Sequence, residues 1–148
     1  LDSSKISLSQ TDGTYRFISY VFSRCPMPNL CPAIVLRNAA LVNQFPEINF
    51  IMISFDYKHD TPTVINKSYG PSVNSYSNWD AWSSTGNIED VYRLVRQSGG
   101  NFWGIEQEKI GHTLSSVLIG KDREVLGVWK GEDWKVDEIS NAIKLLTK

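Results

Sequence analysis

Apolar and polar positions along the chain follow two different periods, and these periods predict a series of strands and helices. Residues 48–55 are almost continuously apolar, which is typical of a strand buried on both faces of a parallel sheet. Residues 14–22 are rich in β-branched and aromatic side chains and predict a second strand. Apolar side chains at positions 88, 91, 92 and 95 instead recur at helical spacing, which predicts a helix that begins after Asn87.

The remaining segments complete an alternating order of elements. Helices are predicted at residues 32–44, from Thr61-Pro62 to a stop at Gly70-Pro71, and at 135–146; strands are predicted at 78–82, 113–119 and 124–130. Alternating strands and helices favour a parallel-rich sheet covered on both faces, and the last two strands form a hairpin. The predicted fold class is therefore α/β: a thioredoxin-like three-layer fold with a mixed central sheet.

Composition narrows the possible function classes. The chain has 148 residues, which is most simply one domain spanning 1–148, and 41% hydrophobic with 21% charged residues is ordinary for a folded protein. A formal charge of −1 argues against nucleic acid or an anionic membrane surface as the main partner. No apolar run is long enough to span a bilayer. Because Leu1 is not an initiator methionine, we expect a missing upstream segment, with an anchor as its expected role.

The two cysteines are the strongest candidates for chemistry. Cys25 and Cys31 are separated by five residues, and three prolines lie within or directly after this loop. Pro32 suits the first position of a helix, so Cys31 is predicted at the N-cap, where unpaired backbone N–H groups and the helix dipole favour a thiolate. The pair follows a strand, at the sheet edge where α/β proteins hold their sites. A metal-binding or redox-active pair is favoured, with a structural disulfide or two inert buried thiols as the alternatives.

Four sequence patches resemble the SCO/SenC family of thioredoxin-fold copper chaperones, over nearly the whole chain. They are Phe22-Ser-Arg-Cys25-Pro…Cys31-Pro32, Ser54-Phe-Asp56-Tyr-Lys-His-Asp60-Thr61-Pro62, Gly111-His112-Thr113 and Gly131-Glu-Asp-Trp134. The chain departs from the family pattern in two places. The family usually has three residues between its cysteines, a five-residue spacing being the form of a divergent branch, and it has proline where this chain has Tyr57.

The resemblance implies a metal site and a role. Cys25 and Cys31 would be two thiolate ligands and a redox pair, and His112 the third ligand, a set that suits Cu(I) and also holds Cu(II). The implied function is a copper-binding assembly factor for the copper centre of a haem-copper (cytochrome c) oxidase. The implied partners are a copper-accepting oxidase subunit or a thiol redox partner. The expected protein is a monomer outside the cytoplasm, in the periplasm or on the outer membrane face, reaching the membrane only through an absent N-terminal anchor.

Two carboxylates and a histidine in the second patch have simpler interpretations. Asp60 or Thr61 is expected to cap the helix that begins at Pro62, and His59 is expected to face solvent. Asp56 is expected to be mainly structural, and a role beside the cysteine loop is the alternative.

Other functions have weaker support. The main alternative is an extracytoplasmic thioredoxin-like thiol–disulfide oxidoreductase without a metal role, so whether the chain is an enzyme stays open. Against it, the cysteines lack the two-residue spacing, and no proline lies beyond Pro71 to precede the facing strand. A domain that uses the disulfide only as a staple is a further alternative. A Gly-x-Ser-x-Gly elbow and Gly-rich phosphate loops are both absent from the sequence.

Overall fold

A computed structural model describes residues 12–24, 30–97, 115–130 and 134–147 of the chain. Its strands are β1 (Arg16–Val21), β2 (Asn49–Ser54), β3 (Trp79–Trp82), β4 (Ser115–Ile119) and β5 (Val125–Lys130), and its helices are α1 (Leu30–Gln44), α2 (Pro62–Val73), α3 (Ile88–Gln97) and α5 (Val136–Leu146). This element order is the predicted one. None of the helices in the described part of the chain is both long and apolar enough to cross a membrane.

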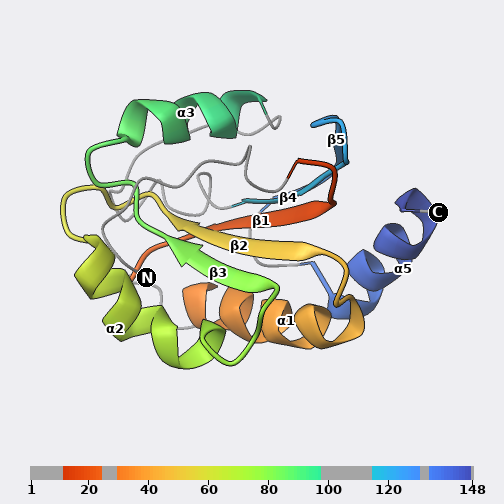
Figure 1. Ribbon diagram of the computed structural model, residues 1–148, viewed down its shortest axis with the longest axis horizontal. Coiled ribbons are helices and arrows are strands. Elements are labelled where there is room, and N and C mark those ends of the chain that lie inside the picture. The colour runs from red at the N-terminus through yellow and green to blue at the C-terminus, as the bar shows by residue number, and fades with distance from the viewer. Residues whose placement is uncertain (1–11, 25–29, 98–114, 131–133, 148) are drawn as a thin grey trace.

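The strands form one mixed sheet in the order β3-β2-β1-β4-β5. The first three run parallel, and β4 lies antiparallel to both β1 and β5. The helices α1 and α2 cover one face of this sheet and α3 lies over the other (Figure 1), as the alternating pattern predicts. Because β1, β2 and β3 are parallel, their carboxyl ends meet at one edge, which is where the first two crossovers toward α1 and α2 begin.

The central strands β1, β2 and β4 are buried and carry apolar side chains on both faces. All six residues of β1 and all five of β4 are buried, and Phe17 packs its ring against Phe50 at a centroid distance of 5.6 Å. A polar group crosses this apolar layer: Asn38 of α1 donates from Nδ2 to Ser19 Oγ (3.1 Å), and Ser19 shares a hydroxyl hydrogen bond of 2.8 Å with Ser116 of β4. These bonds fix α1 to the centre of the sheet, because buried polar atoms must find partners.

Two predicted boundaries are wrong. The helix α2 does not stop at Gly70-Pro71 but continues to Val73, and beyond Pro71, which has no N–H of its own, the N–H of Asn74 still donates to the carbonyl of Gly70 at 2.9 Å. The helix α1 begins at Leu30, so Cys31 is its second residue rather than its N-cap. Pro32 is tolerated there because N–H groups in a first turn have no helical partner.

Trp129 of β5 packs directly over Gly127. A Cβ atom added to Gly127 would lie 2.6 Å from the Trp129 ring, which is shorter than van der Waals contact. The same ring contacts Phe17 in the core at 6.1 Å between centroids, so moving it away from Gly127 would disturb that contact. Gly127 therefore makes room for an aromatic contact between β5 and the core.

We expect Gly127→Ala to lower the free energy of unfolding by about 1–3 kcal/mol, because the methyl group overpacks this contact. Denaturant unfolding of the purified variant measures the change. The same substitution in a Trp129→Leu background should cost clearly less, since the obstructing ring is gone. Equal costs in both backgrounds would contradict the proposed clash.

An ion-pair cluster joins the amino end of β1 to the β4–β5 turn. The half-exposed Asp12 carboxylate accepts hydrogen bonds from Arg123 Nε (2.9 Å) and Arg16 Nη1 (3.1 Å). Arg16 is buried, and its Nη2 donates to Gly120 O at 2.9 Å. The hydrogen bond from Arg123 is the main reason that the pKa of Asp12 is lowered from 3.8 to about 2.

This lowered pKa predicts a pH-dependent contribution to stability. An acid whose pKa is depressed by folding stabilises the protein fully above its unfolded pKa, here 3.8, and loses that effect as pH falls through its folded pKa of about 2. The stability difference between the wild type and Asp12→Asn should therefore be constant above about pH 4 and shrink from there toward pH 2. Urea unfolding across this range tests it, and a difference that stays constant down to pH 2 would contradict it.

Candidate functional site

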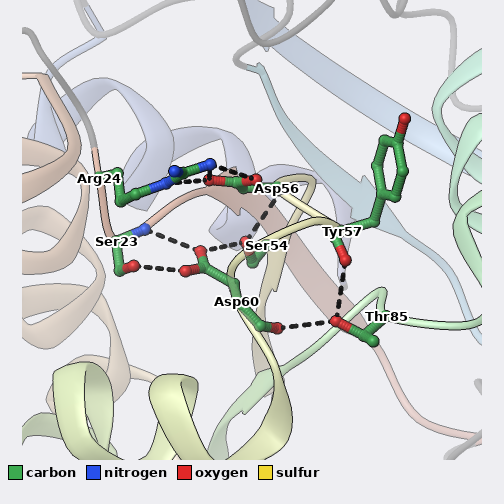
Figure 2. A network of polar contacts seen from close by, with 7 residues as sticks. All are labelled: Ser23, Arg24, Ser54, Asp56, Tyr57, Asp60 and Thr85. Carbon is green, nitrogen blue, oxygen red and sulfur yellow. Dashed lines mark hydrogen bonds and ion pairs between the residues drawn. The ribbon is translucent and has the colours of Figure 1, made fainter.

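The carboxyl ends of the three parallel strands carry a connected set of polar side chains. Ser23 and Arg24 follow β1, Ser54 ends β2 with Asp56 and Asp60 after it, and Thr85 follows β3. Figure 2 shows these residues converging from separate strands, with the aspartates in the middle. The polar cluster is defined here as Ser23, Arg24, Ser54, Asp56, Tyr57, Asp60, Ser83 and Thr85.

Asp60 is the central acceptor of the cluster and is completely buried. Its Oδ2 accepts from the backbone N–H of Ser23 at 2.8 Å and from Ser54 Oγ at 2.5 Å, and its Oδ1 accepts from Ser23 Oγ. Hydrogen bonds to an ionised carboxylate are about twice as strong as neutral ones, so these contacts offset the loss of water. The Asp60 side chain thus connects the ends of β1 and β2.

The backbone of Asp60 extends the cluster to β3. The carbonyl of Asp60 accepts hydrogen bonds from Ser83 Oγ and from Thr85 Oγ1, the latter at 3.3 Å. Thr85 Oγ1 also donates to the carbonyl of Tyr57 at 3.1 Å. Tyr57 contributes this carbonyl to the cluster, and its ring points away from Asp56 (Figure 2).

Asp56 binds the residue directly before Cys25. Arg24 Nε donates to Asp56 Oδ2 at 2.8 Å and Arg24 Nη2 to Oδ1 at 3.1 Å, so the guanidinium holds the carboxylate with two prongs. The Asp56 side chain is 1% exposed and that of Arg24 is 52% exposed. A carboxylate buried to this degree requires such a partner. The contact joins the two β-strand ends and also places this carboxylate beside the start of the cysteine loop, so it is compatible with both interpretations of Asp56.

The turn between β2 and α2 is held by its own sequence. Thr61 is the N-cap of α2 and accepts from the N–H of Val64 at 3.3 Å, with Pro62 in the first turn, as predicted. The carbonyl of Asp56 accepts from the N–H groups of His59 (3.2 Å) and Asp60 (2.9 Å). His59 is exposed, which confirms its prediction. The carboxylates therefore sit on a fixed turn.

Of the predicted ligands, the structure describes only Cys31. It lies in the first turn of α1 and is 3% exposed, within the hydrophobic core. Cys25 and His112 lie outside the described residues, as do Gly111 and Thr113. Within the described ranges, no three His, Cys, Asp or Glu side chains are grouped to hold a metal ion. The predicted ligand set thus remains a prediction.

Beneath the polar cluster lies an aromatic contact that the sequence analysis did not identify. Phe22 and Phe55, which follow β1 and β2, are both buried and pack at a centroid distance of 4.8 Å. The N–H of Phe55 donates to the carbonyl of Val21 at 3.1 Å, so strand pairing continues past the ends of the strands. These two rings extend the hydrophobic core to the positions directly next to Ser23 and Asp56 in the chain.

A model of the SCO1/SenC family matches residues 2–148. No curated protein matched the chain.

Three solved structures illustrate the likeness of fold. BsSco, a member of the Sco family of cytochrome c oxidase assembly proteins with a disulfide switch, is 21% identical with a TM-score of 0.77, covering 97% of this chain and 86% of BsSco. A SCO1/SenC family lipoprotein from Bacillus anthracis is 18% identical (TM-score 0.71; 95% of this chain, 85% of that chain). Arabidopsis thaliana ScoI with copper bound is 16% identical (TM-score 0.71; 94% and 87%). The predicted thioredoxin-like α/β fold is confirmed.

The hydrogen bonds of Asp60 predict the effect of removing its carboxylate. Asp60→Ala leaves the Ser23 N–H and the Ser54 hydroxyl without their acceptor, so the free energy of unfolding should fall by about 2–4 kcal/mol. Asp60→Asn should cost less, because its amide keeps one acceptor oxygen and the Ser23 hydroxyl can rotate to accept from its N–H₂ group. Denaturant unfolding of both variants tests this. A change below about 0.5 kcal/mol for Asp60→Ala would contradict a central role.

Proposed function

Because the chain belongs to the SCO1/SenC family, we propose that it binds copper through its two cysteines and assists assembly of the copper centre of a haem-copper (cytochrome c) oxidase. The family match over residues 2–148 is the observation that carries this proposal. Among the structures with the same fold, Arabidopsis thaliana ScoI was solved with copper bound, and BsSco belongs to a family of cytochrome c oxidase assembly proteins.

The proposed ligands are Cys25, Cys31 and His112. Two thiolates and an imidazole are soft and borderline donors of the kind that Cu(I) prefers, and the metal is cargo rather than a resident cofactor. Cys31 is the second residue of α1, and α1 follows β1 in a crossover toward the parallel strand β2, so Cys31 lies at the carboxyl edge of the sheet with the polar cluster. The second proposed ligand, Cys25, is bonded directly to Arg24, and Arg24 belongs to the polar cluster at this edge.

The same two thiols would couple copper delivery to redox state. When both are reduced they supply thiolate ligands; when they join as a disulfide they give up two electrons and two protons to an oxidant and no longer bind the metal as thiolates. A copper-accepting oxidase subunit and a thiol redox partner are the partners of this cycle. The proposal includes a location outside the cytoplasm with attachment to the membrane. The SCO1/SenC family lipoprotein of the same fold supports this part of the proposal.

Anaerobic Cu(I) titration of the reduced protein against a competing chelator tests the proposal. We expect one copper ion per chain, an affinity lowered at least 100-fold by Cys25→Ser or Cys31→Ser, and a smaller loss for His112→Ala because one of three ligands is removed. His59→Ala is the matched control, since His59 is exposed in the turn after β2 and should leave the affinity unchanged.

The possible outcomes separate the candidate functions. Equal affinity in wild type and both cysteine variants would reject the copper site. If that result came with a reversible Cys25–Cys31 disulfide, thiol–disulfide exchange without metal would become the better assignment. Unchanged affinity in His112→Ala alone would remove His112 from the ligand set.

A further inference from the structure

Ser23 and Arg24 are tied to the β2–α2 turn by separate contacts, immediately before the first cysteine. Ser23 binds Asp60 through its backbone N–H and its hydroxyl, and Arg24 binds Asp56 with two prongs. We propose that Arg24 is a positioning residue: its forked ion pair with Asp56 fixes the chain directly before Cys25 and thereby sets the redox equilibrium and the Cu(I) affinity of the Cys25–Cys31 pair. This inference rests on the proposed function, because it concerns the same pair of thiols.

The shape of the Arg24–Asp56 contact indicates positioning. Two N–H groups of a planar guanidinium meet two oxygens of one carboxylate, which fixes orientation as well as distance. The anchor is rigid, because Asp56 is buried, its N–H donates to Ser54 Oγ at 3.2 Å and its carbonyl accepts two N–H groups of the turn. An exposed pair would hold the chain far more loosely.

The other cysteine is also held. Cys31 is buried in α1, and Asn38, two helical turns later on the same face, donates to Ser19 in β1. Asn38 Nδ2 also donates to the carbonyl of Ile34 at 2.9 Å. The five residues 25–29 therefore join two fixed points, Arg24 and the start of α1. Fixing both ends raises the effective concentration of one thiol near the other.

Positioning and simple electrostatics predict opposite changes in redox equilibrium. A fixed geometry favours every state that needs both sulfurs together, which includes the disulfide as well as bound Cu(I). The positive charge of Arg24, acting alone, would instead favour the thiolate and hence the reduced state. If Arg24 positions Cys25, loss of its two-pronged ion pair with Asp56 should destabilise the disulfide. If Arg24 acts only through its charge, loss of that charge should stabilise the disulfide.

Equilibration with glutathione measures this difference. The two protein thiols and one oxidised glutathione form one protein disulfide and two reduced glutathione molecules, so two electrons and two protons pass from the protein to the glutathione disulfide. The equilibrium constant of this reaction and the Cu(I) affinity are two independent readouts. Substitution of a residue that contributes only to global stability would change neither the oxidation equilibrium constant nor the Cu(I) affinity at a temperature well below unfolding.

The test compares Arg24→Lys, Arg24→Gln and the double variant Arg24→Gln/Asp56→Asn with wild type. We expect each to lower both the oxidation equilibrium constant and the Cu(I) affinity about tenfold, which is about 30 mV in the reduction potential. Arg24→Lys should not keep the wild-type values of the oxidation constant and the Cu(I) affinity, because lysine retains the positive charge but cannot form the two-pronged contact of a guanidinium. The double variant removes the buried charge that Arg24→Gln leaves without its partner, so it keeps the test valid if the single variant unfolds.

Arg123→Gln is the matched control. It removes a two-pronged arginine–aspartate pair at the amino end of β1, where Arg123 contacts Asp12, so both readouts should stay within twofold of wild type. Equal readouts in wild type, Arg24→Lys and the double variant would overturn the positioning role, as would a rise in the oxidation constant. If wild type itself neither bound Cu(I) nor formed a reversible disulfide, the proposed function would fail first and this inference with it.

Discussion

The site end of this protein depends on the burial of one carboxylate. Asp60 has no exposed surface, and a carboxylate in that position is tolerated only when nearly all of its acceptor sites are used. Ser23 and Ser54 satisfy its side chain, and Ser83 and Thr85 bind its carbonyl. These donors come from the ends of three different parallel strands. The need of the buried Asp60 for hydrogen-bond donors therefore defines how those ends are arranged. The β2–α2 turn is thereby an organising element of the sheet edge as well as a connection.

Arginine–aspartate pairs stand at both ends of β1 and differ in which partner is buried. At the amino end the arginine is covered, with Arg16 1% exposed, and the carboxylate of Asp12 is half-exposed. At the carboxyl end the carboxylate of Asp56 is covered and the guanidinium of Arg24 reaches solvent. Between them, the contacts of Ser19, Asn38 and Ser116 fix α1 to the middle of the strand. The central strand is therefore held by polar contacts at three levels, within a layer that is otherwise apolar.

Sequence periodicity predicted the order of the elements because strand and helix periods are local properties. The contact between Arg24 and Asp56 was not predictable from spacing, since 32 residues separate the two and nothing local distinguishes a buried carboxylate from an exposed one. A role for Asp56 beside the cysteine loop was only the alternative interpretation of the sequence, although residues that follow β1 and β2 share an edge of a parallel sheet. The errors at Cys31 and Pro71 both concern prolines: a proline fits the whole first turn of a helix, and Pro71 lies inside the last turn of α2, so neither residue marks a helix end to better than a few residues.

Several contacts of the polar cluster use main-chain atoms, and this has a consequence for how the sequence can diverge. Tyr57 provides a carbonyl, Ser23 partly an N–H, and Asp60 a carbonyl as well as its side chain. A carbonyl is supplied by every residue type, so a different side chain at position 57 would leave the hydrogen bond from Thr85 available. Such a turn depends on the path of its backbone more than on the identity of that residue. Chains of this architecture can thus share one backbone path while most of their side chains differ, as the TM-score of 0.77 at 21% identity between this chain and BsSco illustrates.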